Sequence, residues 1–329
     1  MTLNKVLVTG ASGFIGSYVV ERLLSDGVKV VAFDHQQPGF LTQEKFHSVE
    51  VFLGDTRDAT AVTEAMAHVD GWIHLAGVLG TQETIKNPRP AIMTNIESGL
   101  NILEAAAQYN VPGVNIAVGN HWESNPYSIS KSTVERLCDM YRRYRGVNVS
   151  VVRALNAYGP RQSVFKPYGT SNVRKIIPSF ISRVLHGEPI EVYGDGQQIM
   201  DMIYVADVAD ILVDTLHETA NDGPFEHVIE AGTGADTTVL QIAETVIRHI
   251  GSGTIDYLPL RAGETAGAVV KADLATQHDL YPQGKKLLNL DAGIGLAVYY
   301  YADLFRETAT PSILDTYHMT AQARARSFR

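Results

Sequence analysis

The sequence predicts an α/β protein with a doubly wound parallel sheet and a smaller C-terminal lobe. Three observations support this prediction. Short apolar runs such as KVLVTG and KVVAFD show little alternation with polar residues, which is typical of strands buried on both faces. Amphipathic stretches such as IGSYVVERLLSDG separate these runs, and a strand–helix–strand succession implies parallel pairing through right-handed crossovers. At 329 residues, the chain is also longer than a single hydrophobic core usually supports.

The same alternation continues through the first half of the chain. Further strand-like runs are VEVFLGD, GWIHLAG, VNIAVG and VNVSVVRAL, and the helical stretches ATAVTEAMAH and IESGLNILEAAAQYN lie between the first three. We therefore expect the doubly wound domain over residues 1–158, with a return segment near 201–220. From residue 159 onwards glycine and proline divide the chain into shorter pieces, which predicts a second lobe at 159–329. Its last stretch, AQARARSFR, is expected to be a solvated tail.

Composition and charge exclude several classes of function. The formal net charge of −9 argues against a nucleic-acid-binding surface, which would need a basic stripe. No apolar run reaches the roughly 18 residues of a membrane helix, and the start MTLNKVLVTG lacks the apolar core of a signal peptide. The single cysteine, Cys138, is expected to be a buried, inert thiol, and the histidines lack metal-ligand spacing. We expect a cytoplasmic protein without a metal site.

A glycine-rich turn at the N-terminus indicates dinucleotide binding. VLVTGASGFIGSYVV places Gly10, Gly13 and Gly16 between a strand and a helix, where they permit a tight turn, close approach of a pyrophosphate, and close helix–strand packing. The next strand-like run ends in Asp34, eighteen residues after Gly16. Its carboxylate would accept hydrogen bonds from a ribose 2′-hydroxyl and repel a 2′-phosphate. Because the following residues HQQ include no arginine, NAD is favoured over NADP.

A tyrosine and a lysine one helical turn apart indicate redox chemistry on an alcohol. Tyr127 and Lys131 follow Asn125-Pro126 and share one face of the predicted helix. A lysine ammonium near a phenol favours the phenolate, which can take a hydroxyl proton as hydride leaves for a nicotinamide.

Seven motifs in order resemble the extended short-chain dehydrogenase/reductase superfamily, specifically its NAD-dependent nucleotide-sugar epimerases and dehydratases. They are TGASGFIG at 9–16, GDTRD at 54–58, HLAG at 74–77, PYSISK at 126–131, RALNAYGPRQ at 153–162, YGDGQQIMDMIYVADVAD at 193–210 and RAGE at 261–264. The resemblance implies a Rossmann sheet, bound NAD and a nucleotide-diphosphate sugar substrate. It also implies a homodimer through the helix at AIMTNIESGLNILEAAAQYN and the Tyr127 helix, since the former has apolar residues on more than one face.

The resemblance assigns a set of residues to the cofactor. Asp55 would hydrogen-bond the adenine, and Asn95 would support the active site. Tyr127 would be the base, while Lys131 would hold the nicotinamide ribose and lower the pKa of the tyrosine. The full set is Gly10, Gly13, Phe14, Ile15, Gly16, Asp34, Asp55, Thr56, Leu75, Ala76, Gly77, Asn95, Tyr127 and Lys131.

A second set, in the C-terminal half, would hold the nucleoside diphosphate of the substrate. These residues are Asn156, Arg161, Val192, Tyr193 and Arg261. An acidic protein needs local arginines to bind a diphosphate, and arginine does so in a bidentate manner. The family often has an arginine where Met200 stands, so one contact is expected to be lost or moved. Lys166, Arg174 or Lys175 could replace it.

The segment before the tyrosine helix departs from the family pattern. Family members usually have Ser or Thr at the end of this strand, followed by a longer loop, whereas this chain has AVGN and then HWESNP. In one interpretation Ser124, Asn120 or His121 supplies the missing hydrogen bond. In a second, Glu123 or His121 is a new acid or base for a further step such as elimination. In a third, the protein binds NAD and a nucleotide sugar but turns over poorly or not at all.

The favoured hypothesis is an NAD-dependent nucleotide-sugar epimerase acting at C4 through a transient 4-keto intermediate. The family's 4,6-dehydratases usually carry an adjacent Asp-Glu pair, and only Glu123 is present here, so dehydration is the second hypothesis. A non-catalytic binding protein on the same fold is the third.

Overall fold

The computed structural model describes residues 2–40, 48–261 and 264–327. The chain divides into two compact units. Unit 1 comprises Met1–Leu155, Val205–Gly232 and Ala272–Lys286, and unit 2 comprises Asn156–Tyr204, Thr233–Lys271 and Leu287–Arg329. Two later segments therefore return to unit 1. The first covers most of the return segment expected near 201–220, whereas the second was not expected from the sequence.

Unit 1 contains a seven-stranded sheet in which all neighbouring strands are parallel, in the order β11-β6-β5-β4-β1-β2-β3. The strands are β1 (Lys5–Thr9), β2 (Lys29–Asp34), β3 (Val49–Leu53), β4 (Gly71–His74), β5 (Gly113–Val118), β6 (Val149–Ala154) and β11 (Ile229–Ala231). The chain builds outward from β1 in one direction and then from β4 in the other. This topology confirms the predicted doubly wound parallel sheet and places a switch point between β1 and β4, where such folds bind ligands.

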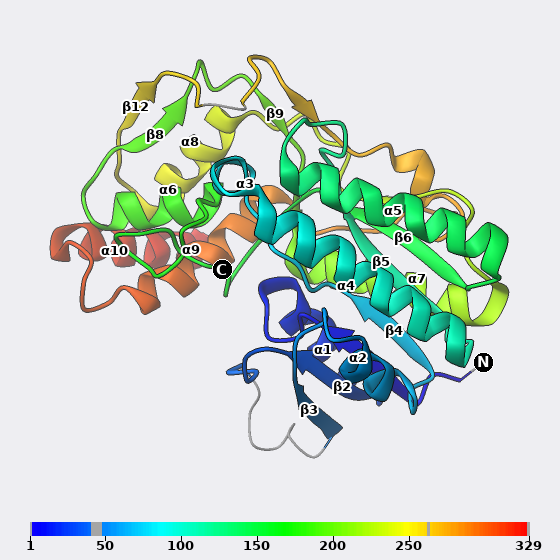
Figure 1. Ribbon diagram of the computed structural model, residues 1–329. Helices are drawn as coiled ribbons and strands as arrows, with labels where there is room; N and C mark the ends of the chain where they lie inside the picture. The colour runs from blue at the N-terminus through cyan, green and yellow to red at the C-terminus, as the bar shows by residue number, and fades with distance from the viewer. Residues whose placement is uncertain (1, 41–47, 262–263, 328–329) are drawn as a thin grey trace. The chain divides into compact units, whose positions relative to one another are not determined.

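Helices cover both faces of this sheet. They are α1 (Phe14–Ser25), α2 (Ala59–Met66), α3 (Thr81–Lys86), α4 (Pro88–Tyr109), α5 (Pro126–Arg145) and α7 (Val205–Asp222), with a short 3-10 helix at Leu274–Gln277. Helix α1 packs against α7, while α4 packs against α2 and α5. Figure 1 shows α4 and α5 side by side across the strands.

The core under α2, α4 and α5 follows from the apolar strands beneath them. Phe33 of β2 and Trp72 of β4 are almost fully buried there, together with Leu103 of α4 and Tyr141 of α5. Cys138 of α5 belongs to the same cluster, and burial raises the pKa of its thiol to about 12, as expected for an inert cysteine.

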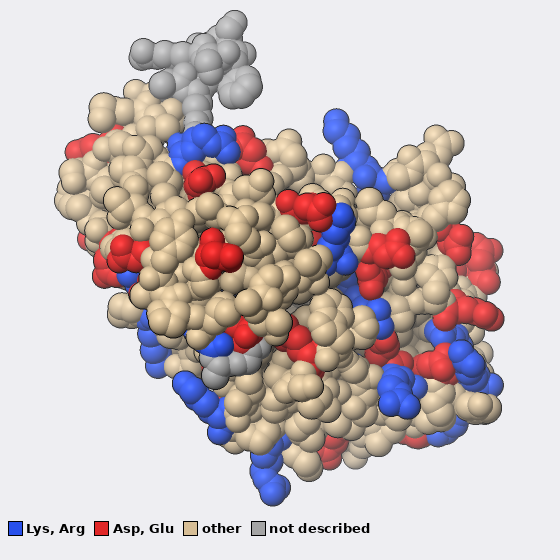
Figure 2. All heavy atoms as spheres, turned by 90° about the horizontal axis from the view of Figure 1, so that it is seen from above, with Lys and Arg blue, Asp and Glu red and all other residues tan. Residues whose placement is uncertain are grey.

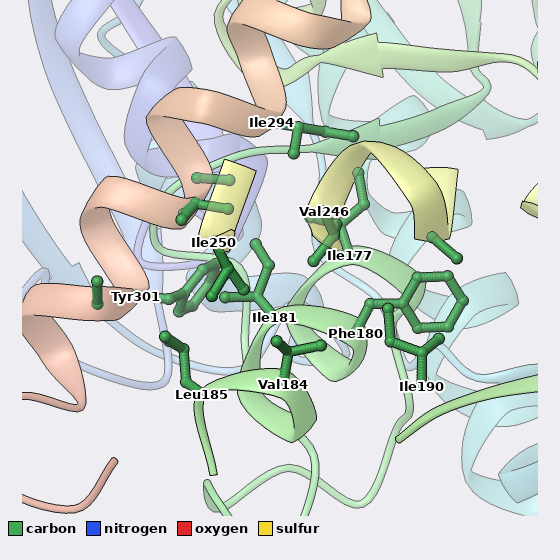
Figure 3. Close-up of a cluster of buried hydrophobic side chains, with 14 of the residues drawn as sticks. Ile177, Phe180, Ile181, Val184, Leu185, Ile190, Val246, Ile250, Ile294 and Tyr301 are labelled. Atoms are coloured by element: carbon green, nitrogen blue, oxygen red, sulfur yellow. The ribbon is translucent and has the colours of Figure 1, made fainter. Parts of the chain in front are cut away.

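Unit 2 contains three parallel strand pairs and four helices. The pairs are β7 (Asn156–Tyr158) with β10 (Met202–Tyr204), β8 (Ile190–Tyr193) with β12 (Ile255–Leu258), and β9 (Ile199–Met200) with β13 (Val269–Val270). The helices in its described residues are α6 (Ile176–Leu185), α8 (Val239–Ile250), α9 (Leu290–Leu304) and α10 (Pro311–Ser327). Side chains from α6, α8 and α9 meet in one apolar core, in which Ile181, Val246 and Ile294 are fully buried (Figure 3).

The expectation of a solvated C-terminal tail is wrong. Helix α10 extends to Ser327, and its residues Leu314 and Tyr317 are buried in the core of unit 2. The basic residues near the end of the chain drew attention away from the apolar residues of the preceding turns.

The surface mixes charges of both signs. Figure 2 shows acidic and basic side chains interspersed over one face of the described residues. Within the described ranges, no helix has the length and apolar character required to cross a bilayer.

Candidate active site

The predicted site residues of unit 1 lie at the carboxyl ends of five neighbouring strands. Gly10 follows β1, Asp34 ends β2, Asp55 follows β3, Leu75 follows β4 and Asn120 comes soon after β5. Because the strands are parallel, these ends share one edge of the sheet, the edge at which open α/β folds bind ligands. The two sets of predicted residues belong to different units, and each is described within its own unit.

The turn between β1 and α1 requires glycine for steric reasons. Gly10 has a φ of +69°, in the left-handed region that favours glycine, and a Cβ there would lie 2.8 Å from the backbone nitrogen of Ala76. A Cβ on Gly16 would lie only 2.0 Å from the carbonyl oxygen of Gly10. These glycines hold the start of α1 tightly against the ends of β1 and β4.

The N-terminus of α1 has backbone donors that no protein group satisfies. Gly13 is the N-cap residue and provides no side-chain hydrogen bond, so the cap is made of backbone alone. In the described part of the chain, the N–H groups of Phe14, Ile15 and Gly16 make no hydrogen bond, whereas the N–H of Ser17 donates to the carbonyl of Gly13. Unsatisfied N–H groups at a helix N-terminus suit a phosphate, so this turn fits the pyrophosphate of NAD.

The carboxylate of Asp34 is held in a fixed orientation beside this turn. Its Oδ2 accepts the N–H of Ser12 at 2.9 Å and its Oδ1 accepts the N–H of Gln36 at 3.1 Å. The Nδ1 of His35 lies 3.0 Å from Oδ1, and the Asp34 side chain is only 7% exposed. A carboxylate fixed in this way can accept hydrogen bonds from ribose hydroxyls, which fits the predicted role.

The next predicted pair, Asp55 and Thr56, makes contacts within the protein. A hydrogen bond from Arg57 lowers the pKa of the Asp55 carboxyl, with the guanidinium nitrogens 2.5 to 3.1 Å from its oxygens. The Thr56 hydroxyl lies 2.7 Å from that of Ser98 on α4, and the Asn101 side chain donates to the carbonyl of Thr56. The Thr56 side chain therefore anchors this loop to α4, while the adenine contact of Asp55 stays a prediction.

A buried threonine–histidine pair joins β1 to the loop after β4. The Thr9 hydroxyl oxygen lies 2.7 Å from Nδ1 of His74 and accepts the N–H groups of Leu75 and Ala76 at 3.2 and 3.3 Å. Burial lowers the pKa of His74 to about 3, with a further contribution from the charge of Lys131, so the imidazole is neutral. The proton of the Thr9 hydroxyl is left to donate to Nδ1, which assigns the imidazole proton to Nε2.

Asn95 connects the cofactor loop to the tyrosine helix. Its Oδ1 accepts the N–H of Val78 at 2.7 Å, and its Nδ2 donates to the carbonyl of Val78 and to the Ser130 hydroxyl, at 3.0 and 2.9 Å. Ser130 in turn donates to the backbone carbonyl of Tyr127 at 2.9 Å. Asn95 and Ser130 are almost fully buried, so this chain of bonds fixes the loop and the first turn of α5 together. Gly77 lies directly against Asn95, where a Cβ would come within 2.9 Å of Oδ1.

Tyr127 and Lys131 lie one turn apart on α5. Burial raises the pKa of Tyr127 to about 12 and lowers the pKa of Lys131 to about 8. Neither side chain makes a hydrogen bond to another described residue. The resemblance implies a lowered tyrosine pKa, and here the described residues produce the opposite shift, because the loss of solvation at the phenol is the dominant effect.

The turn between β5 and α5 contains the remaining candidates. Asn120 and Asn125 both donate to Oε2 of Glu123, at 2.7 and 2.9 Å. The Nδ1 of His121 lies 3.3 Å from the carbonyl of Gly119, close to the limit of a hydrogen bond. The structure thus brings Asn120 and Glu123 together, while Ser124 is exposed at the surface of the turn.

The packing at the end of β5 explains why a hydroxyl residue is absent at Gly119. A Cβ on Gly119 would lie 2.3 Å from Cδ1 of Leu155, so a serine or threonine would require Leu155 to move. The turn instead displays Trp122, which is 57% exposed and lies edge-to-face with the His121 ring at 5.0 Å between centroids.

In unit 2 three of the predicted or compensating residues come together. The guanidinium carbon of Arg261 lies 4.3 Å from the centre of the Tyr193 ring, and Arg174 Nη1 lies 2.9 Å from the Tyr193 hydroxyl. Arg261 also forms an ion pair with Glu264. Val192 is fully buried in the core of unit 2, so its side chain is not available to a ligand.

The other unit 2 candidates do not join this group through any described contact. The Asn156 side chain donates to the carbonyl of Asp201 at 3.1 Å, and Arg161 has a φ of +69°, unusual for a residue with a side chain. Met200 lies on β9. Residues 262 and 263, in the middle of the RAGE motif, lie outside the described residues.

Sequence reasoning missed several residues that organise the site. Ser12 orients Asp34, Ser130 links Asn95 to Tyr127, and Asn125 joins Glu123 to α5. Ser12 and Ser130 lie inside the motifs TGASGFIG and PYSISK, so those motifs were the available signal. The pairing of Asn120 with Glu123 had no signal in the sequence.

Comparisons with known proteins agree with this geometry. The model of the "NAD dependent epimerase/dehydratase family" matches residues 6–232. UDP-glucuronic acid decarboxylase 1 of Arabidopsis thaliana is 29% identical over 79% of this chain, which spans 62% of that protein's length. The low-salt glycan biosynthesis protein Agl12 of Haloferax volcanii is 29% identical over 90% of this chain and 98% of its own.

Solved structures match over nearly the whole chain. A UDP-glucose 4-epimerase of Thermus thermophilus, in complex with NAD, is 28% identical and covers 93% of this chain and 100% of its own, with a TM-score of 0.74. Similarity therefore extends well beyond the glycine-rich turn.

Proposed function

The chain belongs to the NAD dependent epimerase/dehydratase family, and on that premise we propose that it is a nucleotide-sugar 4-epimerase acting through a transient 4-keto sugar. The observation that carries this proposal is the arrangement at α5. Tyr127 has no hydrogen-bonding partner among the described residues, while Glu123, the group that dehydration would require, accepts two amide donors. One proton-transfer group suffices for epimerisation, whereas elimination needs a further acid or base.

The residues of unit 1 fit NAD. The three unsatisfied N–H groups of α1, all within the described residues, match a pyrophosphate, and the fixed carboxylate of Asp34 matches ribose hydroxyls. When bound, NAD supplies the carbon that takes up a hydride from the sugar and returns it.

Tyr127 would move the proton that accompanies this hydride. Its phenolate oxygen accepts the proton of the sugar's 4-hydroxyl as C4 loses hydride, which leaves a ketone at C4. Once the keto sugar presents its opposite face, C4 regains hydride and Tyr127 returns the proton to the oxygen. The net change is inversion at C4, with no atom gained or lost.

Lys131 supports this proton transfer from within the protein. Its ammonium is buried, and its pKa of about 8 leaves it mostly protonated at neutral pH. The positive charge favours the tyrosinate over the phenol. Since burial alone raises the pKa of Tyr127 to about 12, the cationic nicotinamide must contribute the rest of the lowering.

The arginines of unit 2 suit the diphosphate of the substrate. Arg174 and Arg261 are held at Tyr193, and the guanidinium group binds phosphate oxygens in a bidentate manner. Arg161 and Asn156 are proposed to belong to the same set. Helix α4, which exposes Met93 and Leu100, is proposed to form a homodimer contact with α5.

A test of this proposal uses the protein as purified. The cofactor is released by denaturation and measured, and the native protein is then mixed with UDP-, dTDP- and GDP-sugars while near-ultraviolet absorbance reports reduced nicotinamide. We expect bound NAD and slow, partial reduction with at least one sugar, and none in Tyr127→Phe. Bound NAD that no sugar reduces, in a protein that converts none of them, would contradict the proposal and favour a binding protein.

A further inference from the structure

We infer that Glu123 is a positioning residue, whose carboxylate fixes the short turn between β5 and α5 and thereby the direction of Tyr127. This inference rests on the proposed function, and it excludes the role of acid or base that an isolated glutamate beside the tyrosine helix suggests. Four features of the turn support it.

The first feature is the convergence of two amides on one oxygen. Asn120 Nδ2 and Asn125 Nδ2 lie 2.7 and 2.9 Å from Oε2 of Glu123, and the Glu123 N–H donates to the carbonyl of Asn120 at 3.1 Å. Two N–H donors directed at one carboxylate oxygen stabilise its ionised form. Protonation of that oxygen, which general acid catalysis would require, would break the arrangement.

The second feature is the continuation of this network into α5. Asn125 is the N-cap of α5, where its Oδ1 accepts the N–H of Ser128 at 2.9 Å. Its Nδ2 also lies 3.2 Å from the Ser128 hydroxyl, and both residues are almost fully buried. Glu123 thus holds the residue that caps the helix, and Tyr127 is the second residue of that helix.

The third feature is that the turn is tied to α5 at a second point. Ser132, one position after Lys131, donates its hydroxyl proton to the carbonyl of His121 at 2.9 Å. The two ends of the turn are therefore attached to α5 on either side of the Tyr127–Lys131 turn. A displacement of the loop would be transmitted to the side chains that lie between these attachments.

The fourth feature is the shortness of the turn itself. Only the residues GNHWESN separate β5 from α5, and Gly119 is packed against Leu155. A short turn has few alternative paths, so one carboxylate can determine its conformation.

Glutamine separates positioning from proton transfer. The side-chain oxygen of a glutamine can accept the same two amide donors, but it does not exchange a proton near neutral pH. Glu123→Gln should therefore preserve the turn and the activity, whereas Glu123→Ala should lose both. Glu50→Ala serves as a matched control, because Glu50 forms an exposed ion pair with Lys5 on the sheet.

The kinetic experiment compares kcat and KM for the three variants with the sugar that the wild type converts. We expect Glu123→Ala to lower kcat by about 10- to 100-fold, since misplacement by about an ångström costs up to about 10²-fold, with little change in KM. Glu123→Gln and Glu50→Ala should stay within about threefold of wild type in kcat. Equal loss in Glu123→Gln and Glu123→Ala would overturn the inference and assign proton transfer to Glu123. Full activity in Glu123→Ala would overturn it as well.

A second readout does not depend on turnover. The chain has two tryptophans, Trp72, which is 1% exposed, and Trp122, which is next to Glu123 and 57% exposed. Quenching of fluorescence by acrylamide therefore reports mainly on the turn. Glu123→Ala should change the quenching, and Glu123→Gln should restore the wild-type value.

This readout separates failure of the inference from failure of the proposed function. If no sugar is converted, the quenching alone still decides whether Glu123 fixes the turn, and unchanged quenching in Glu123→Ala overturns the inference. If Glu123→Ala does not fold, Asn120→Ala removes one of the two donors and leaves the cap by Asn125 in place. It should then produce the same changes in quenching and kcat to a smaller extent, and wild-type behaviour would contradict the inference.

Discussion

Two strand-to-helix turns of unit 1 treat their helix N-termini in opposite ways. At the turn from β1 to α1, Gly13 caps the helix without a side chain, and three N–H groups of the first turn make no hydrogen bond in the described structure. At the turn from β5 to α5, Asn125 caps the helix with its side chain, and Glu123 holds Asn125 in turn.

This difference separates two ways in which a helix serves a site. Helix α1 leaves its backbone donors available, which suits an anion. Helix α5 satisfies its own N-terminus, and it contributes the side chains of Tyr127 and Lys131. We conclude that α1 is built to bind a cofactor and α5 to hold reacting groups, and each conclusion can be tested by substitution.

The largest effect is expected from removing the reacting group of α5. Tyr127→Phe should lower kcat by about 10²- to 10⁴-fold, the usual contribution of a general acid or base. Because the phenol makes no hydrogen bond to a described residue, stability and NAD content should stay near wild type. Turnover assays and NAD quantification measure both effects. A variant that retains most of the activity would remove Tyr127 from the mechanism.

The buried ammonium of α5 should affect stability through pH. Folding lowers the pKa of Lys131 from 10.5 to about 8, so the unfolded chain binds more protons between these values. Stability contributed by this group therefore rises as pH increases from about 8 to 10.5, and the cost below pH 8 is roughly 3 kcal/mol. Lys131→Met should lack this rise and should be more stable than wild type at pH 7, although less active.

Urea unfolding at pH 7 and at pH 10 measures this prediction. The result that would contradict it is a Lys131→Met variant whose free energy of unfolding, relative to wild type, is the same at both values.

The cofactor side of the comparison is tested at Asp34. Asp34→Ala removes a charged acceptor whose hydrogen bonds are worth about 1.5–3 kcal/mol, so NAD should bind about 10- to 100-fold more weakly. Titration of cofactor-depleted protein with NAD measures the change, and Glu50→Ala is the control. Unaltered affinity would show that Asp34 only orders the turn through Ser12 and Gln36.

The smallest effect is expected from the helix caps. Asn125 caps α5 and Asn289 caps α9 of unit 2, each accepting the N–H three residues later at 2.9 Å. Asn125→Ala and Asn289→Ala should each lower the free energy of unfolding by about 1 kcal/mol. Only Asn125→Ala should also lower kcat, because only that cap is joined to Glu123 and Tyr127. Equal kcat values for the two variants would show that the α5 cap has no role in orienting the tyrosine.

The two turns also differ in how well the sequence predicts them. The β1–α1 turn depends on glycine, whose lack of a Cβ is visible in the sequence, and Gly10 and Gly16 have the close contacts that their spacing predicts. The apolar strands likewise predicted the parallel sheet. These features depend on local steric requirements and on hydrophobic periodicity.

The β5–α5 turn depends on side-chain hydrogen bonds that spacing does not reveal. Asn120, Glu123 and Asn125 were each visible, yet nothing in the sequence indicated that both amides donate to the same carboxylate oxygen. The raised pKa of Tyr127 was missed for a related reason, because it arises from burial by residues distant in the sequence. Long-range contacts also return Ala272–Lys286 to unit 1, where Tyr281 donates to Asp214 at 2.5 Å.

The proposed epimerisation is tested most directly by proton NMR in deuterated water, with the purified protein and a panel of UDP-, dTDP- and GDP-sugars that includes UDP-glucuronic acid. We predict a new anomeric signal from the C4 epimer of one sugar, with no deuterium entering at C5. Deuterium at C5, a stable 4-keto product or loss of the sugar's carboxyl group would contradict C4 epimerisation and would make dehydration or decarboxylation the reaction of this site.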